Sequence, residues 1–205
     1  VDILYEDTFL IVAFKPPFLL VHDDGNNQDT LQARINGYLQ LNGNKYPAQA
    51  IHRIDYETSG LVLFCKHPFF QAYCDKNMEE HHIKKEYIAL VQGHTNYKNK
   101  KIISNIARDR HNAKKMIIHP NGKESISIFN TIKNYKDCSL IQVTILTGRK
   151  HQIRVQCASL NHPILNDSLY GGKMTDDTGL LLQSHHIQFN DVDITCPQEK
   201  RFIRK

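Results

Sequence analysis

Hydrophobic and polar positions along this chain follow spacings that predict many strands and few helices. Two short apolar runs, at residues 9–14 and 61–65, have the length of buried strands. Residues 124–133 and 139–146 alternate in polarity instead, which is typical of antiparallel strands with one face on a core. A turn over residues 134–137 joins these two segments, so we expect them to pair with each other.

The remaining segments add strands at both ends of the chain and three helices. Further strands are predicted over residues 3–5, 50–54, 84–92, 180–189 and 192–195, and helices over residues 31–39, 68–80 and 151–160. Asp29 or Thr30 is expected to cap the first helix. Residues 97–101 are predicted to form a basic loop, and the pattern assigns no element to residues 102–118. Because strands dominate and no long linker interrupts them, the pattern predicts an α+β fold with a mixed or antiparallel sheet.

Composition narrows the class of protein only moderately. The 205 residues carry a formal net charge of +5, which permits an anionic partner without requiring one. No apolar run approaches the roughly 20 residues that a membrane-spanning helix needs. The five cysteines are scattered without a C-x-x-C pair, as expected of reduced thiols in a cytoplasmic protein. The twelve histidines lack the spacing of metal ligands, so we expect no metal site. The sequence begins with Val1, which leaves open whether residues precede it.

The stretch from Ile51 to Lys66 carries the strongest candidate chemistry. Its carboxylate, Asp55, follows a cation, Arg53, and precedes a hydroxyl-rich turn before the apolar run begins. Functional carboxylates are often held in this way, on a loop fixed between rigid elements. The alternative is that Asp55 caps a turn and pairs with Arg53 at the surface.

Residues 52–61 read His-Arg-Ile-Asp-Tyr-Glu-Thr-Ser-Gly-Leu and resemble H-R-L-D-x-x-T-S-G-L, the signature of the RluA-type pseudouridine synthases. The resemblance implies that Asp55 is the catalytic residue. It also implies that Arg53 enters the RNA stack as the target base leaves, a role that suits a cation with a flat face.

Two later segments resemble the other motifs of this family. Tyr87, in Lys-Lys-Glu-Tyr-Ile-Ala-Leu-Val, resembles the tyrosine that lies against the target base, although a strand tyrosine packed in a core would look the same. Residues 147–154, Thr-Gly-Arg-Lys-His-Gln-Ile-Arg, resemble T-G-R-x-H-Q-I-R. The resemblance implies that Arg154 pairs with the catalytic Asp55, and a guanidinium beside a partly buried carboxyl favours its charged form.

Basic residues near these motifs are candidates for RNA binding. Arg149 and His151 are expected to meet RNA phosphates, while Lys150 is compatible with a solvated turn. Lys114 and Lys115 are expected to make further phosphate contacts.

Two turns depart from the family pattern. Phe18 stands where the family has glycine after Lys-Pro-x, so we expect a local difference in that turn. Asn166 replaces glycine in H-P-I-x-G-D, and because asparagine tolerates left-handed backbone we expect the same turn there.

The resemblance covers nearly the whole chain and implies one catalytic domain over residues 1–205, without an amino-terminal RNA-binding appendage. The implied fold is a long, largely antiparallel mixed sheet in two halves, with flanking helices and a central catalytic cleft. The implied function is isomerisation of specific uridines in structured RNA (rRNA or tRNA) to pseudouridine, by a cytoplasmic monomer without a cofactor or an obligatory protein partner. Two rivals are a non-catalytic RNA-binding protein with this fold and a metal-dependent hydrolase that uses the histidines.

Overall fold

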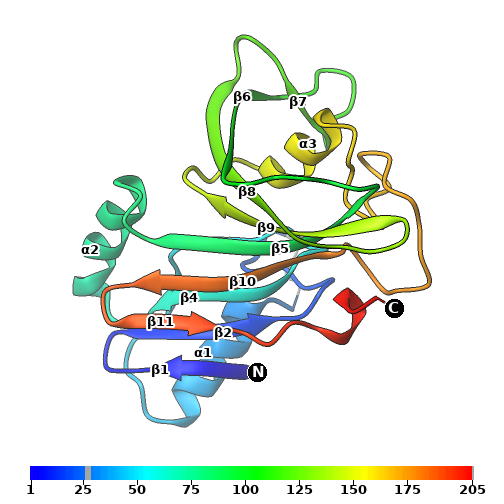
Figure 1. Cartoon of the computed structure of the whole chain (residues 1–205). Coiled ribbons are helices and arrows are strands. Elements are labelled where there is room, and N and C mark those ends of the chain that lie inside the picture. The colour runs from blue at the N-terminus through cyan, green and yellow to red at the C-terminus, as the bar shows by residue number, and fades with distance from the viewer. Residues whose placement is uncertain (26–28, 205) are drawn as a thin grey trace. The chain divides into compact units, whose positions relative to one another are not determined.

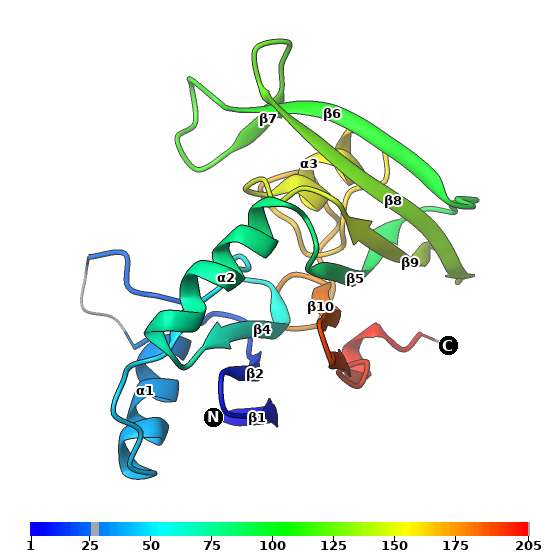
Figure 2. The same ribbon diagram turned by 90° about the vertical axis from the view of Figure 1, so that its left-hand side faces the viewer.

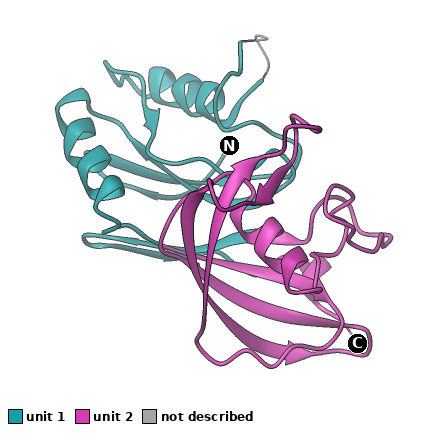
Figure 3. Ribbon diagram, turned by 90° about the horizontal axis from the view of Figure 1, so that it is seen from above, with its two compact units in different colours: residues 1–84, 183–197 teal, residues 85–182, 198–205 magenta. Residues whose placement is uncertain are grey.

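The computed structural model describes residues 1–25 and 29–204. The chain forms two compact units, residues 1–84 with 183–197 and residues 85–182 with 198–205, which Figure 3 colours separately. Each unit is built on β-strands with helices packed against them, and antiparallel strand pairs outnumber parallel ones. The predicted α+β class with a mixed, mostly antiparallel sheet is confirmed.

The first unit orders its strands β1-β2-β4-β10, with β3 beside β4 and β11 beside β10. The β4–β10 pair is parallel, and the other pairs of this unit are antiparallel. The elements, labelled in Figure 1, are β1 (Asp2–Glu6), β2 (Leu10–Lys15), α1 (Leu31–Leu41), β3 (Gln49–Ala50), β4 (Ser59–Cys65), α2 (Pro68–Glu79), β10 (Leu182–Phe189) and β11 (Val192–Thr195).

The core of the first unit explains why β4 reads as an unbroken apolar run. All seven residues of β4 are buried, as expected of a strand covered on both faces. Leu61 and Leu63 pack with Leu10 of β2 and Ile187 of β10 in one apolar cluster. Helix α2 adds Cys74 to the same cluster, so the strand that follows the Asp55 loop sits on a rigid base.

The second unit orders its strands β5-β9-β8-β6-β7, all antiparallel. Helix α3 packs against β6 and β7, inside the curve of this sheet in Figure 2. The elements are β5 (Lys84–Gln92), β6 (Lys100–Arg108), β7 (Met116–Ile118), β8 (Lys123–Asn134), β9 (Cys138–Ile145), α3 (Gln152–Ser159) and the short 3₁₀ helix η1 (Lys200–Phe202).

Most predicted elements are confirmed. Strand β5 has the predicted bounds, β8 and β9 pair as expected, and Thr30 caps α1 by accepting a hydrogen bond from the backbone N–H of Ala33. Two predictions are wrong. The basic loop at 97–101 is partly strand, because β6 begins at Lys100 and forms a hairpin with β7. The extended conformation predicted for residues 50–54 is limited to β3, and the chain beyond it is an irregular loop.

The two turns that depart from the family pattern both contain left-handed backbone. Asn166 adopts φ +65°, as expected, and its side-chain amide donates to the carbonyl of Asp177 at 2.8 Å. Phe18 adopts φ +62°, which also lies in the left-handed region. For a residue other than glycine this conformation costs about 1–2 kcal/mol. The backbone at Phe18 is therefore strained.

Two further features of the structure concern the cysteines and the lengths of the helices. All five cysteines are buried thiols that form no disulfide, and burial raises the pKa of the Cys74 thiol to about 12. In the part of the chain that the structure describes, no helix has the length and apolar character needed to cross a membrane.

Candidate active site

Asp55 lies in the irregular loop that leads into β4, and its side chain is half-buried. Its backbone carbonyl accepts a hydrogen bond from the N–H of Thr58 at 3.1 Å, which closes the loop into a turn. Thr58 and Ser59 are buried beneath it, at 1% and 0% exposure. The loop therefore presents a carboxylate at the edge of a packed scaffold, where a substrate can reach it.

Gly60 is required at the point where this loop becomes β4. Its φ is +111°, and a Cβ at this position would lie 2.1 Å from the backbone oxygen of Ser184. The parallel pairing of β4 with β10 brings the two backbones this close. The glycine of the motif is thus explained by strand pairing, which fixes where the loop that carries Asp55 ends.

Lys15, at the end of β2, is fully buried under the same loop. Its ammonium donates to three backbone carbonyl oxygens, those of Pro16 at 2.9 Å, Leu19 at 2.8 Å and Tyr56 at 3.1 Å. Burial lowers the pKa of Lys15 to about 7, and the negative charge of Asp55 opposes this shift. One buried cation therefore joins the turn after β2 to the residue that follows Asp55. The sequence pattern had indicated only that β2 ends here.

The two motif residues before Asp55 have different environments. His52 is half-buried, and its Nε2 accepts a hydrogen bond from the backbone N–H of Leu63 in β4 at 3.2 Å. Arg53 is exposed, and its Nη1 lies 3.4 Å from Nε2 of His22. His52 thus anchors the loop to the strand, whereas Arg53 extends from it toward solvent.

Tyr87 lies in the middle of β5, opposite Val143 of β9, and is only 6% exposed. Side chains alternate along a strand, so Tyr87 and Lys85 share the face opposite Glu86. Glu86 accepts hydrogen bonds from Gln142 and Thr144 on its own face. Burial lowers the pKa of Lys85 to about 8.

Arg154 is buried in α3 and forms a two-pronged ion pair with Asp167. Its Nε donates to Oδ2 and its Nη2 to Oδ1, both at 2.8 Å, and the two side chains are 4% and 0% exposed. The guanidinium also lies 5.3 Å from the ring centroid of Tyr170. Within this unit Asp167 therefore fixes the orientation of Arg154. Sequence reasoning gave Asp167 no role, because a spacing of thirteen residues across a turn does not predict a contact.

Tyr170 connects several predicted RNA-binding residues within the second unit. Its hydroxyl accepts a hydrogen bond from the N–H of Met116 at 2.8 Å and lies 2.9 Å from Nδ1 of His151. The ammonium of Lys115 lies 5.5 Å from the centroid of the same ring. His151 itself has left-handed backbone, with φ +54°, at the N-cap of α3. The structure therefore brings Lys115, His151 and Arg154 together around one tyrosine.

The other basic residues predicted to bind RNA are at the surface. Arg149 is exposed and donates from Nε to the carbonyl of Glu124 at 2.9 Å. Lys114 is exposed in the hairpin between β6 and β7, where its backbone N–H donates to the side chain of Asn112. Both side chains are therefore accessible to a partner in solution, and their RNA-binding role stays a prediction.

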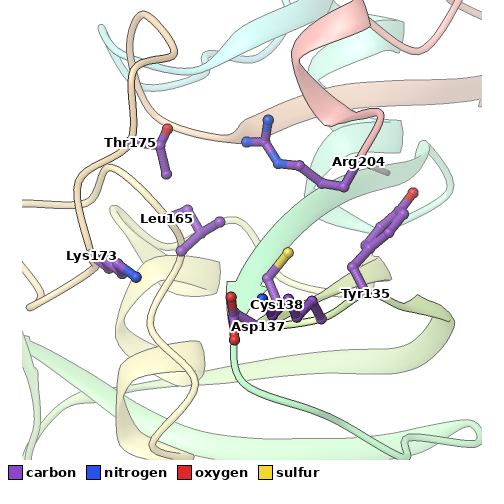
Figure 4. A pocket seen from close by; sticks show the side chains of 8 residues that line it. Tyr135, Asp137, Cys138, Leu165, Lys173, Thr175 and Arg204 are labelled. Carbon is purple, nitrogen blue, oxygen red and sulfur yellow. The ribbon is translucent and has the colours of Figure 1, made fainter.

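A pocket of about 320 Å³ also lies in the second unit, and none of these predicted residues lines it. It lies beside the turn between β8 and β9, as Figure 4 shows. Its lining residues are Tyr135, Lys136, Asp137, Cys138, Leu165, Lys173, Thr175 and Arg204. No group of three or more His, Cys, Asp or Glu side chains suited to a metal ion occurs among the described residues.

Most of the chain matches a known protein family. Residues 9–159 match the family model of RNA pseudouridylate synthases. The chain belongs to this family. A ribosomal large subunit pseudouridine synthase C from Buchnera aphidicola is 37% identical over 182 residues, covering 85% of this chain and 55% of that protein. The uncharacterized RNA pseudouridine synthase YhcT of Bacillus subtilis is 36% identical over 174 residues, covering 83% and 58%.

The pseudouridine synthase fold is shown independently by a solved structure. Human RNA Pseudouridylate Synthase Domain Containing 1 superposes with a TM-score of 0.82 at 23% identity, covering 96% of this chain and 83% of that one. The chain spans little more than half the length of the two bacterial relatives.

Proposed function

We propose that this protein isomerises specific uridines in structured RNA to pseudouridine, with Asp55 as the nucleophile. Membership of the RNA pseudouridylate synthase family carries this proposal. The name of the Buchnera relative supports ribosomal RNA as one substrate class, with tRNA as the alternative.

The reaction breaks the bond between the ribose and a uracil nitrogen, rotates the base and joins it again through carbon. It needs a group that attacks, a cation that keeps this group ionised and a surface for the base. Asp55 suits the first task, because its carboxylate is accessible on a loop whose backbone is held by the buried Lys15. An isomerisation rearranges bonds within one substrate, so we propose that no cofactor or metal takes part.

Arg154 and Tyr87 are proposed to supply the other two functions. The bond of Arg154 to Asp167 uses its Nε and Nη2 edge, and we propose that its other edge serves Asp55. A guanidinium suits this arrangement better than an ammonium, because its planar fork can address two carboxylates at fixed angles. Tyr87 is proposed to lie against the target base.

RNA binding is assigned to the exposed cations. We propose that Arg149, Lys114 and Lys115 contact phosphates, and that His151 acts beside them through its position at the N-terminus of α3. Arg53, exposed two residues before the nucleophile, is proposed to fill the space that the extruded base leaves. We further propose that the two units act as one catalytic domain, as a monomer in the cytoplasm.

Release of tritium from RNA labelled at uracil C5 tests this function, because joining the base through carbon displaces the hydrogen at that position. Purified protein would be incubated separately with rRNA and tRNA fractions, and Asp55→Asn would serve as the blank. Release by the wild-type protein above this blank supports the proposal and identifies the substrate class. No release from either fraction, with RNA binding intact, would favour a non-catalytic RNA-binding protein.

A further inference from the structure

Two large aromatic side chains are exposed in the loop region around Asp55. Tyr56 directly follows the proposed nucleophile and is 48% exposed, and Phe18 is 45% exposed. Their ring centroids lie 5.8 Å apart with an angle of 65° between the ring planes. Hydrophobic side chains of this size are normally buried, so a contacting pair that is half in solvent beside a functional group indicates a binding surface.

The backbone beneath the two rings is fixed by hydrogen bonds. The N–H of Phe18 donates to the carbonyl of Tyr56 at 2.8 Å, and the ammonium of Lys15 donates to the same carbonyl at 3.1 Å. One carbonyl oxygen therefore holds both residues in a defined relation to the turn of Asp55. A surface that is ordered before binding loses little conformational entropy when a ligand arrives.

Phe18 also occupies a conformation that its side chain disfavours. Its φ of +62° is in the left-handed region, where a bulky residue is an outlier and glycine is not. Its ring is not used to fill the core, so packing does not explain why the chain has phenylalanine here. Strain of this kind is commonly found at functional sites, where the strained side chain serves binding.

We propose that Phe18 and Tyr56 form an aromatic platform on which an unpaired nucleobase next to the target uridine stacks. Single-stranded and looped RNA is recognised largely by stacking of splayed bases on aromatic side chains. The platform rests on the proposed function, because it presents a neighbouring base while Asp55 acts on its target.

Binding of two oligonucleotides separates stacking from phosphate contact. The first probe is a short single-stranded oligouridylate, and the second has the same phosphates but abasic riboses at its central positions. Phe18→Ala and Tyr56→Ala are each expected to lower affinity for the oligouridylate about tenfold, within the range for one stacked base. Affinity for the abasic probe should not change, and the dependence on salt should keep its slope, because the rings carry no charge.

Two further variants control for exposure and for strain. Phe69→Ala removes an aromatic side chain that is 87% exposed on α2 of the same unit, and it should leave both affinities unchanged. Phe18→Gly removes the ring and the strain together, whereas Phe18→Ala removes only the ring. Both should lose the same affinity for oligouridylate, while Phe18→Gly should be no less stable than the wild type in urea. The proposal would be overturned if the variants lost affinity in proportion to their loss of stability in urea and not according to whether the ring is present. It would also be overturned if a variant lost as much affinity for the abasic probe as for oligouridylate.

A tryptophan probe gives an independent measurement, because the sequence contains no tryptophan. In Phe18→Trp, oligouridylate should quench the fluorescence of the single indole and the abasic probe should not. Equal quenching by both would overturn the platform. Tritium release by the wild type is measured in parallel, so that active enzyme without base-dependent binding refutes only the platform. Base-dependent binding without any release refutes only the proposed function.

Discussion

Replacing Asp167 by asparagine should destabilise the fold severely, because it breaks a buried ion pair with Arg154. Arg154 and Asp167 are 4% and 0% exposed and share two hydrogen bonds of 2.8 Å. Asparagine keeps the shape of the side chain, but its amide N–H group then faces the donors of the guanidinium. Breaking a buried pair in this way costs about 3–5 kcal/mol, a large part of the roughly 5–15 kcal/mol that stabilises an ordinary domain.

A surface ion pair of the same type provides the matched control. Arg34 donates from Nε to both carboxylate oxygens of Asp29, at 3.0 and 3.1 Å, but these side chains are 46% and 60% exposed. Asp29→Asn should therefore cost far less than Asp167→Asn, because solvent screens an exposed pair. Asp29 and Asp167 thus form the same kind of ion pair with an arginine, but only the pair of Asp167 is buried.

The free energy of unfolding of both variants is measured by urea denaturation, with circular dichroism as the signal. The values are compared with one common slope of free energy against urea concentration. A second variant, Arg154→Met with Asp167→Leu, removes both charges of this buried pair and should be more stable than Asp167→Asn, because apolar side chains replace the pair as a whole. Similar losses of unfolding free energy in Asp167→Asn and Asp29→Asn would contradict the role given to burial. A double variant less stable than Asp167→Asn would contradict it as well.

Three other predictions concern Arg154, the buried Lys15, and the lysines between β6 and β7. Arg154→Lys should lower turnover at least about tenfold, or about 1.4 kcal/mol in the barrier, because a point charge cannot replace a planar fork; wild-type rates in single-turnover tritium release would contradict this. The pKa of Lys15 is about 7 when folded and 10.5 ordinarily, so the unfolded chain binds more protons between these values and stability rises with pH there. Lys15→Met should abolish this rise, and parallel curves of unfolding free energy against pH for the two proteins would refute the assignment. Replacing Lys114 and Lys115 by alanine should weaken RNA binding and flatten its salt dependence by roughly one unit per lost contact without changing which uridine is modified, which filter binding at several salt concentrations and site mapping would check.

Local patterns were sufficient to predict most elements. Strand β5 follows from the apolar run between Lys84 and Gln92, and α1 follows from Thr30 and the apolar face behind it. Polarity and capping act over a few residues, so a sequence shows them directly. Strand β6 was missed because its hairpin partner β7 has only three residues, too short for a periodic signal.

The contacts that orient the site could not be predicted in this way. The burial of Lys15 depends on three carbonyls that only the folded chain brings together, one of them 41 positions away. The pairing of Arg154 with Asp167 depends on how the chain turns back after α3. The contacts of Tyr170 with His151 and Lys115 are likewise fixed by tertiary packing. The motif thus predicted a reacting group, while the contacts around its proposed partners came from the structure.

The most direct test of the account is turnover of Asp55→Asn measured beside its affinity for RNA. Glu57→Gln is the matched control, because it neutralises a second half-buried carboxylate two residues further along the same loop. We predict that Asp55→Asn abolishes tritium release while RNA affinity and the urea midpoint stay close to those of the wild type, and that Glu57→Gln remains active. Pseudouridine formation by pure Asp55→Asn protein at the wild-type rate would contradict the assignment of Asp55 as the nucleophile.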